Sequence, residues 1–305
     1  MHPRKKPYEL ILYEYLRIRR GLSSDENSKY RKLKKGYEGE LLFDAYIDNL
    51  SCDYLSLTDL WFSHNNRFFQ VDNILLMNNT IYMYEVKNFL GNYYYENEKL
   101  FIEPNQEVDD PLTQLKRSEA LLRQLLKNLE FLNHVQAKVV FVNPEFTLLQ
   151  APRTSKIVLP SQLNRYFHKL QQAPTRLDIS FHHLAEKLQS IRLEKSPYIQ
   201  YPIYDYNQLK KGIPCRSCHK FFETVEGRTC ICHYCGMREA LHSAVLRAIE
   251  EFAFLFPDQR ITTDRVSHWI HLSLPEKRIR YVLNKYYIQK GKNKGAYYVK
   301  KNNYT

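Results

Sequence analysis

Two carboxylates and a lysine lie within one short stretch of the chain, residues 70 to 87. Asp72 lies in one apolar run, and Glu85 and Lys87 end a second run that follows an Asn-Asn-Thr turn. Side chains alternate along a strand, so Glu85 and Lys87 should point to the same face, and a hairpin would bring Asp72 beside them. Carboxylate oxygens bind magnesium, and a lysine can act where an attacking water meets a phosphate. The pattern therefore predicts a metal-dependent phosphodiesterase site.

The runs that carry these groups are apolar almost throughout. They contain Val71, Ile74, Leu75 and Leu76 before the turn and Ile81, Tyr82, Met83, Tyr84 and Val86 after it. This composition is typical of strands buried on both faces, where a carboxylate or a lysine needs a partner or a metal ion. The alternative interpretation is a surface hairpin whose charged residues face water, because motifs this short also arise by chance.

Motifs within the hairpin and on either side of it follow one another in a definite order. They are G-x-x-G-E at residues 36 to 40, Q-V-D-N at 70 to 73, E-V-K-N at 85 to 88, Gly91, and P-L-x-Q at 111 to 114. This order, over about residues 30 to 145, resembles the nuclease-related domain family, NERD, of the PD-(D/E)xK superfamily. The resemblance implies an α/β fold, with a restriction-endonuclease-like core built on a mixed sheet.

The resemblance also implies the ligands of a magnesium or manganese ion. Asp72 and Glu85 would hold the ion together with the backbone carbonyl of Val86. Glu40, from the first core helix, would approach the ion or its water shell. Glu38 is the alternative to Glu40, and the sequence does not separate the two.

Two further residues would act on the substrate if the resemblance holds. Lys87 would orient or deprotonate the water and stabilise the transition state. Gln114 would form a hydrogen bond near Lys87 or the scissile phosphate. Hydrolysis would leave a 5′-phosphate and a 3′-hydroxyl. Some members of the superfamily bind nucleic acid without cutting it, but every motif residue is present in this chain.

Hydrophobic patterning predicts the elements that must position these residues. Asp110 is a plausible cap, and Pro111 suits the first turn of the helix that it begins. We expect helices over residues 8–20, 30–50 and 111–133, a loop over 21–29, strands near 54–62, 67–77, 80–87, 93–103 and 137–142, and mostly helix over 160–192.

Five of the six cysteines lie between residues 215 and 235, which suggests metal binding rather than disulfides. Cys215, Cys218, Cys232 and Cys235 form a C-x2-C-x13-C-x2-C pattern that resembles a zinc ribbon, and two such turns complete a tetrahedral zinc site. We expect this zinc to be structural. Cys230 could replace Cys232, although the Gly after Cys235 favours Cys232. His219 and His233 are spare ligands, and an iron–sulfur cluster is the alternative cofactor.

The C-terminal segment combines three expected helices, over 237–256, 262–271 and from Glu276, with a basic hairpin. Ser273 is the expected cap of the third helix. This arrangement resembles a winged helix-turn-helix, whose third helix would enter the major groove and whose wing would touch phosphate. A protein-interaction module is the alternative. The residues expected to bind nucleic acid are Lys277, Arg280, Asn284, Lys290, Lys292 and Lys294.

Length and charge set the expected domain organisation. The chain has 305 residues and a net charge of +12, with basic ends and a slightly acidic middle. It has no apolar run of about 18 residues and no signal-peptide core, so we expect a cytoplasmic protein without a membrane span. The expected domains are a basic N-terminal helix (1–29), the nuclease domain (30–192), a linker (193–212), the zinc ribbon (213–236) and the winged helix (237–305).

These observations favour a magnesium-dependent DNA endonuclease that its C-terminal modules place on DNA. The alternatives are a non-catalytic, regulatory DNA-binding protein with a silent nuclease fold, and an RNA-directed nuclease. A-form RNA does not offer the major groove that a winged helix reads, which argues against RNA. Cutting of both strands would favour a homodimer, because each chain has one site. An activating protein partner is one way in which host DNA could be spared.

Overall fold

The computed structural model describes residues 4–172, 177–195, 197–198 and 201–301, and the remaining residues of the predicted segments lie outside this description. The chain forms two compact units. Unit 1 comprises residues 1–9 and 29–201, and unit 2 comprises residues 10–28 and 202–305. The segment 1–29, expected as a separate helix, is therefore divided between the two units.

Two helices carry the chain across these boundaries. Helix α1 (Tyr8–Arg19) follows the expectation, but helix α2 (Ser24–Asp48) begins earlier than predicted and shortens the expected loop. The reason is a capping box: the Ser23 hydroxyl accepts a hydrogen bond from the Glu26 amide, and the Glu26 carboxylate accepts one from the Ser23 amide. The motif S-x-x-E was present in the sequence and was missed.

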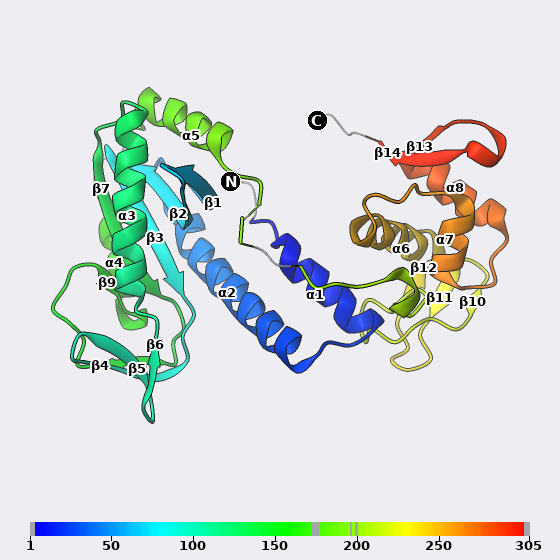
Figure 1. Cartoon of the computed structure of the whole chain (residues 1–305), viewed down its shortest axis with the longest axis horizontal. Helices are drawn as coiled ribbons and strands as arrows, with labels where there is room; N and C mark the ends of the chain where they lie inside the picture. The colour runs from blue at the N-terminus through cyan, green and yellow to red at the C-terminus, as the bar shows by residue number, and fades with distance from the viewer. Residues whose placement is uncertain (1–3, 173–176, 196, 199–200, 302–305) are drawn as a thin grey trace. The chain divides into compact units, whose positions relative to one another are not determined.

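A five-stranded sheet forms the centre of unit 1 (Figure 1). Its order is β1-β2-β3-β7-β9. Strand β2 pairs antiparallel with β1 and β3, whereas β3, β7 and β9 run parallel, so the sheet is mixed. The mixed-sheet α/β fold predicted from the sequence is confirmed. The bounds are β1 (Leu55–His64), β2 (Arg67–Met77), β3 (Thr80–Lys87), β7 (His134–Phe141) and β9 (Ile157–Val158).

Helices cover both faces of this sheet. One face buries its apolar side chains with those of α3 (Pro111–Asn128) and α5 (Ile179–Ile191). The other buries them with α2 and α4 (Leu163–Gln171), through residues such as Phe43 and Phe167. A short 3-10 turn, η1 (Pro160–Gln162), precedes α4. The coverage explains why β2 and β3 read as apolar runs rather than as alternating strands.

A second, four-stranded sheet in unit 1 differs from the prediction. Its order is β6-β5-β4-β8. The single strand expected over 93–103 is a hairpin, because Asn97 and Glu98 both adopt positive φ and form a tight turn. In unit 1 the short strands β6, β8 and β9 were not predicted. The bounds are β4 (Gly91–Glu96), β5 (Lys99–Ile102), β6 (Gln106–Val108) and β8 (Phe146–Leu149).

Helix α3 has the predicted start and an earlier end. The Asp110 carboxylate accepts a hydrogen bond from the Leu112 amide at 3.0 Å, and Pro111 occupies the first turn. The helix ends at Asn128 rather than near residue 133, because Glu130 adopts a positive φ of 64° and turns the chain. The start is what matters for the site, since it places Gln114 in the first turns of α3.

The part of unit 2 from residue 202 onward combines a small sheet with helices α6, α7 and α8 and a hairpin. The sheet has the order β10-β11-β12, and β13 pairs with β14. Residues 238–240 form a strand rather than the start of a helix, and Ser273 does not cap α8, whose cap position is Pro275 without a side-chain hydrogen bond. The bounds are β10 (Val225–Glu226), β11 (Thr229–Ile231), β12 (Arg238–Ala240), α6 (Leu241–Leu255), α7 (Thr263–Ile270), α8 (Glu276–Tyr286), β13 (Tyr287–Lys290) and β14 (Tyr297–Lys300); η2 (Tyr206–Gln208) and η3 (Asn293–Gly295) are 3-10 turns.

A buried arginine explains why residues 10–28 belong to unit 2. Arg19 donates hydrogen bonds to both carboxylate oxygens of Glu251, at 2.8 and 2.7 Å, and to the carbonyls of Lys210 and Gly212. Its guanidinium also lies 4.1 Å from the centre of the Trp269 ring. Removing one partner of such a buried pair typically costs about 3–5 kcal/mol. Helix α1 is therefore part of the core of unit 2.

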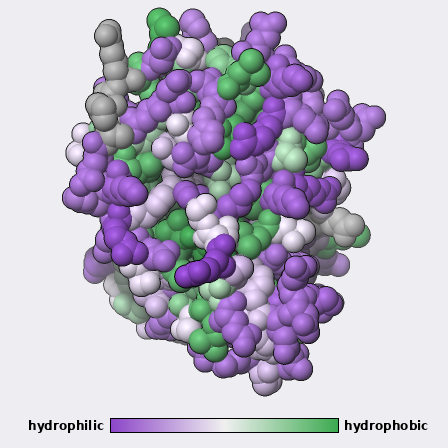
Figure 2. All heavy atoms as spheres, turned by 90° about the vertical axis from the view of Figure 1, so that its left-hand side faces the viewer, coloured by the Kyte–Doolittle hydropathy of each residue, from purple (hydrophilic) through white to green (hydrophobic). Residues whose placement is uncertain are grey.

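Hydrophilic residues cover most of the face of unit 1 shown in Figure 2, with hydrophobic atoms visible between them. Within the residues that the structure describes, no helix has the length and apolar character needed to cross a membrane.

Candidate active site

The candidate site lies where strands β2 and β3 stop pairing with each other. Their ladder runs from Met77 opposite Thr80 to Asn73 opposite Tyr84. Beyond this pair the Val86 amide donates its hydrogen bond to a side chain instead of to the backbone of β2: Asp72 Oδ2 accepts it at 2.8 Å. Asp72 is buried and thus fixed by the backbone of the neighbouring strand. The backbone carbonyl of Val86 remains a predicted metal ligand.

Glu85 and Lys87 lie on the same face of β3, as strand alternation requires. The Lys87 ammonium donates to Glu85 Oε1 at 2.7 Å and to Gln114 Oε1 at 3.0 Å. Helix α3 supplies Gln114 from its capped N-terminal end. The structure therefore brings Asp72, Glu85, Lys87 and Gln114 together through three separate elements.

The G-x-x-G-E motif brings α2 against the end of β3. Gly39 is buried, and a Cβ placed on it would lie 2.5 Å from Cβ of Asn88, so only glycine permits this approach. Asn88 also donates a hydrogen bond to the carbonyl of Lys35 at 2.8 Å. Glu40 consequently lies in the site, while Glu38 is exposed and pairs with Lys34 at 3.7 Å.

Arg4 enters the same site, which the sequence did not predict. Its guanidinium donates to Glu40 Oε2 at 2.8 Å and to both oxygens of Asp44 at 2.7 and 3.0 Å. A further hydrogen bond of 3.2 Å reaches the carbonyl of Asp72. Arg4 lies in a basic run, Arg-Lys-Lys, that looks like ordinary solvated charge. The spacing of Glu40 and Asp44, one helical turn apart, was the only signal that a buried cation belongs there.

Asp59 is a second residue that the prediction missed. Asp59 lies on β1 between the pairs Thr58–Asn73 and Leu60–Val71. It does not pair with β2 itself, and its place in the register is opposite Asp72. Asp59 adopts a φ of 53°, which is unusual for a residue within a strand. Its exposed carboxylate accepts a hydrogen bond from Gln70 at 3.2 Å and raises the pKa of both Glu40 and Asp72.

Burial and mutual repulsion raise the carboxyl pKa values in the site. Burial and then the charge of Asp72 raise the pKa of Glu40 to about 8, although Arg4 opposes the shift. The same two causes raise the pKa of Glu85 to about 7. Burial also raises the pKa of Asp72. Burial lowers the pKa of Lys87, but Glu85 and Asp72 outweigh it and raise the pKa overall, so the lysine is charged.

The charges in the site do not balance. Four buried or partly buried carboxylates, of Glu40, Asp44, Asp72 and Glu85, lie near two cations, those of Arg4 and Lys87, and the exposed carboxylate of Asp59 lies beside them. When all are ionised, the negative charges exceed the positive charges by two without Asp59 and by three with it, an excess that a divalent ion would reduce. Oxygen donors of this kind suit magnesium or manganese.

The carboxylates are less tightly gathered than a closed metal site. Among the described residues, the four cysteines form the only group of three or more His, Cys, Asp or Glu side chains close enough to hold a metal ion, with ligand atoms within 4.8 Å of one another. Asp72, Glu85 and Glu40 each use one oxygen for an amide or a cation. The second oxygen of each accepts no hydrogen bond from any residue that the structure describes. These donors therefore fit a divalent ion whose remaining ligands are water.

Part of the chain matches a known family model. Residues 35–142 match the family model of the nuclease-related domain. The nuclease-related domain so defined contains all five predicted catalytic residues and excludes Arg4. No curated protein and no solved structure matches the chain. The mixed-sheet core of unit 1 is consistent with the restriction-endonuclease-like fold that the resemblance implies.

The four-cysteine cluster lies in unit 2. The Sγ atoms of Cys215, Cys218, Cys232 and Cys235 lie within 4.8 Å of one another. Two of the sulfur pairs are 3.7 and 3.5 Å apart, close to the roughly 3.8 Å expected when four sulfurs surround zinc at about 2.3 Å. All six cysteines are free thiols. Cys230 is buried outside the cluster, so the geometry selects Cys232.

The residues expected to bind nucleic acid lie on two neighbouring elements. Lys277, Arg280 and Asn284 are exposed on α8, and Lys290 and Lys292 are exposed at the turn between β13 and β14. Arg280 pairs with Glu276 at 2.6 Å within the same helix. The side chain of Lys294 lies outside the described residues. Helix α8 and the β13–β14 hairpin are present as expected.

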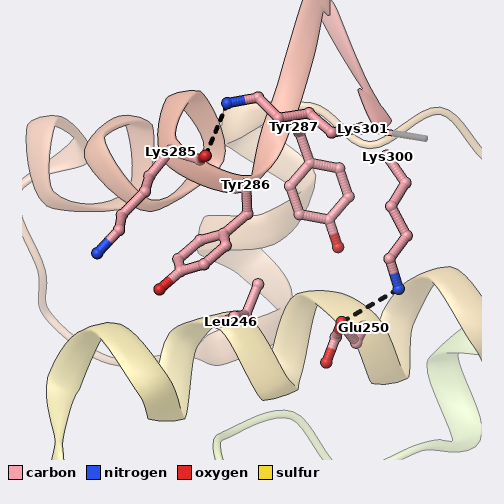
Figure 3. A pocket seen from close by; sticks show the side chains of 7 residues that line it. All are labelled: Leu246, Glu250, Lys285, Tyr286, Tyr287, Lys300 and Lys301. Atoms are coloured by element: carbon pink, nitrogen blue, oxygen red, sulfur yellow. Dashed lines mark hydrogen bonds and ion pairs between the residues drawn. The ribbon is translucent and has the colours of Figure 1, made fainter. Parts of the chain in front are cut away.

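A pocket of about 360 Å³ lies elsewhere in unit 2 (Figure 3). Two of its three lysines are already engaged: Lys300 lies 3.3 Å from Glu250, and Lys301 donates to the carbonyl of Lys285 at 2.7 Å. The first contact joins β14 to α6. The second satisfies a backbone carbonyl near the C-terminal end of α8, so both lysines have structural partners within unit 2. The lining residues are Leu246, Glu250, Lys285, Tyr286, Tyr287, Lys300 and Lys301.

Proposed function

We propose that the protein is a magnesium-dependent endodeoxyribonuclease whose unit 1 cuts DNA and whose unit 2 binds it. The observation that carries this proposal is the junction of β2 and β3. There Asp72 is clamped by the Val86 amide, and Glu85, Lys87 and Gln114 form a hydrogen-bonded chain beside it. The match of residues 35–142 to the nuclease-related domain supports the same reaction class.

In this proposal Asp72 and Glu85 hold a magnesium or manganese ion, with Glu40 in its water shell and the Val86 carbonyl as a further ligand. The ion would polarise the phosphate and lower the pKa of a bound water. The excess negative charge of the site supports this ligand set, because it needs a divalent cation for balance. Manganese has the same preference for oxygen and should replace magnesium.

Lys87 is the proposed partner of the attacking water. Glu85 and Gln114 hold its ammonium from two sides, so the charge stays at a fixed position near the carboxylates. A fixed positive charge stabilises the negative charge that develops on the phosphate oxygens in the transition state. Gln114 orients this lysine and lies within reach of the scissile phosphate.

Unit 2 supplies the proposed binding function. The four cysteines would hold a structural zinc ion, which stabilises a segment too small to have a core of its own. Helices α6, α7 and α8 with the β13–β14 hairpin would act as a winged helix-turn-helix. The exposed basic residues on α8 and on the hairpin turn support this role, since basic side chains contact phosphate.

The test compares cleavage of plasmid, linear and single-stranded DNA with magnesium, manganese or EDTA. We expect metal-dependent cutting by the wild type and none by Asp72→Ala. Lys156→Ala is the matched control, because Lys156 pairs with Glu119 at 2.6 Å in the same unit but outside the site. Equal cutting by Asp72→Ala and the wild type would refute the assignment of the site.

The separation of the carboxylate oxygens favours a second candidate, a non-catalytic DNA-binding protein. Each carboxylate is already satisfied in part by a cation or an amide, as a silent site would require. This candidate predicts metal-independent binding without cleavage under every condition of the same test. The endonuclease remains the better supported function, because the excess negative charge suits a divalent ion and residues 35–142 match the nuclease-related domain.

A further inference from the structure

Arg4 belongs to the candidate site although it lies outside the region that matches the nuclease-related domain. Its side chain is only 1% exposed and forms four hydrogen bonds. Asp44 engages two of its nitrogens, Nε and Nη2, in a bidentate pair. The third nitrogen, Nη1, is thereby aimed at Glu40. A guanidinium held in this way is a rigid charge rather than a mobile one.

The contacts of Arg4 distinguish it from an ordinary structural ion pair. A pair with Asp44 alone would only attach the N-terminal segment to α2. Arg4 also reaches Glu40, which couples electrostatically to Asp72, and the backbone carbonyl of Asp72 itself. The positive charge therefore lies between the helix carboxylates and the strand that carries the first metal ligand. In two-metal phosphodiesterase sites, a second divalent ion about 3.5–4 Å from the first supplies further positive charge to the site.

We propose that Arg4 is a positioning residue that takes the place of a second divalent cation, fixing Glu40 and limiting the carboxylate site to one metal ion. The charge count supports this stoichiometry. With Arg4 present, the four carboxylates other than the exposed Asp59 exceed the two cations by two negative charges, which one divalent ion neutralises. Without Arg4 the excess rises to three, and the space beside Glu40 and Asp44 becomes available to a second ion. The inference rests on the proposed function of the same site.

The experiment counts manganese ions bound to the full-length, zinc-loaded protein. Electron paramagnetic resonance of free Mn²⁺ gives the number of bound ions and their affinities, independently of cleavage. We expect one ion in the wild type, one in Arg4→Lys, and a second ion in Arg4→Met. Arg123→Met is the matched control, because Arg123 pairs with Glu119 and the Val135 carbonyl in unit 1, outside the site.

A second variant guards against misfolding of Arg4→Met. Asp44→Asn keeps the arginine but weakens its anchor, and we expect it to bind one ion while cutting DNA about 10–100-fold more slowly, as outer partners of metal sites do. Arg4→Lys should restore part of the activity of Arg4→Met. This partial rescue would not follow from a merely structural role.

The outcomes separate this inference from the proposed function. A single ion in Arg4→Met, or cleavage at the wild-type rate by that variant, would overturn the role of Arg4. Loss of all bound manganese in Arg4→Met would overturn it as well, because Arg4 would then be required for the first ion. If the wild type binds no manganese that Asp72→Ala removes, the proposed function itself fails.

Discussion

The two candidate metal sites of this protein are assembled in different ways. The cysteine cluster uses four thiols from one segment of about twenty residues, and their sulfur atoms already lie at zinc-like distances. The carboxylate site draws on α2, β2, β3, α3 and the segment before α1, and its oxygens are held by Arg4, Lys87 and the Val86 amide. A site formed by neighbours in sequence depends on its metal to fold. A site formed by residues from several elements depends on the fold to bring them together, and its own cations hold the carboxylates in place.

The largest expected effect is on the cysteine cluster. Cys232→Ser should lose zinc and unfold residues 213–236, because the metal supplies the folding free energy of such a small segment. Measurement of bound zinc together with thermal unfolding checks this. Cys230→Ala is the matched control, since Cys230 is buried outside the cluster, and it should keep its zinc. If Cys230→Ala lost zinc and Cys232→Ser kept it, Cys230 rather than Cys232 would be the zinc ligand.

Lys87→Ala should lower DNA cleavage about 10²–10⁴-fold while DNA binding changes little, because the lysine acts on the reacting groups and not on the fold. Single-turnover cleavage and a gel-shift assay measure the two effects. Lys156→Ala loses a comparable ion pair and should cut normally. Equal losses in both variants would mean that unit 1 responds to any missing charge, and the scaffold argument would fail.

Gly39→Ala tests the scaffold rather than the chemistry. The new methyl group would lie 2.5 Å from Asn88 Cβ, so α2 must shift and move Glu40. We expect cleavage to fall roughly tenfold or more, since misplacement by about 1 Å can cost 10²-fold. Gly36→Ala, in the same helix with open space around it, should be neutral or stabilise the helix by up to about 1 kcal/mol. Crystal structures or cleavage rates of the two variants separate these outcomes.

The smallest expected effect is a pH dependence of the stabilisation by magnesium. The carboxyl pKa values of Glu40 and Glu85 are raised from 4.5 to about 8 and about 7 in the folded protein. The folded state therefore binds more protons than the unfolded state between those values, so the metal-free protein loses stability as pH rises from about 4.5 to 8. Magnesium must displace these protons, so its stabilising effect should be greatest near pH 8.

Thermal unfolding with and without magnesium at pH 5 and pH 8 measures this difference. We expect the melting temperature to rise by roughly 5 °C with magnesium at pH 8 and to change little at pH 5. Glu40→Gln should reduce the difference, because it removes one titrating carboxyl group. A magnesium effect that is larger at pH 5 than at pH 8 would contradict the proposed ligands.

The parts of the site that follow from local pattern were predictable from the sequence. Strand alternation placed Glu85 and Lys87 on one face, the Asp110-Pro111 cap began α3 and so placed Gln114, and C-x2-C spacing placed the cysteines. Those that depend on distant contacts were not. Arg4 meets Glu40 and Asp44 across roughly forty residues, and no periodicity encodes that meeting. The turn at Asn97 and Glu98 likewise divides the single strand expected over 93–103 into a hairpin, although the polar residues 96–99 were a local signal for it.

The division of the chain has a consequence for how such a protein can be inherited and recombined. The chain leaves unit 1 after residue 9 and returns to it at residue 29, so neither unit is a single continuous stretch. A gene fragment that starts at residue 30 would encode the whole matched domain without Arg4, and one that starts at residue 202 would lack Arg19. A single crossover could not exchange either unit intact. An exchange of either unit therefore needs more than one crossover.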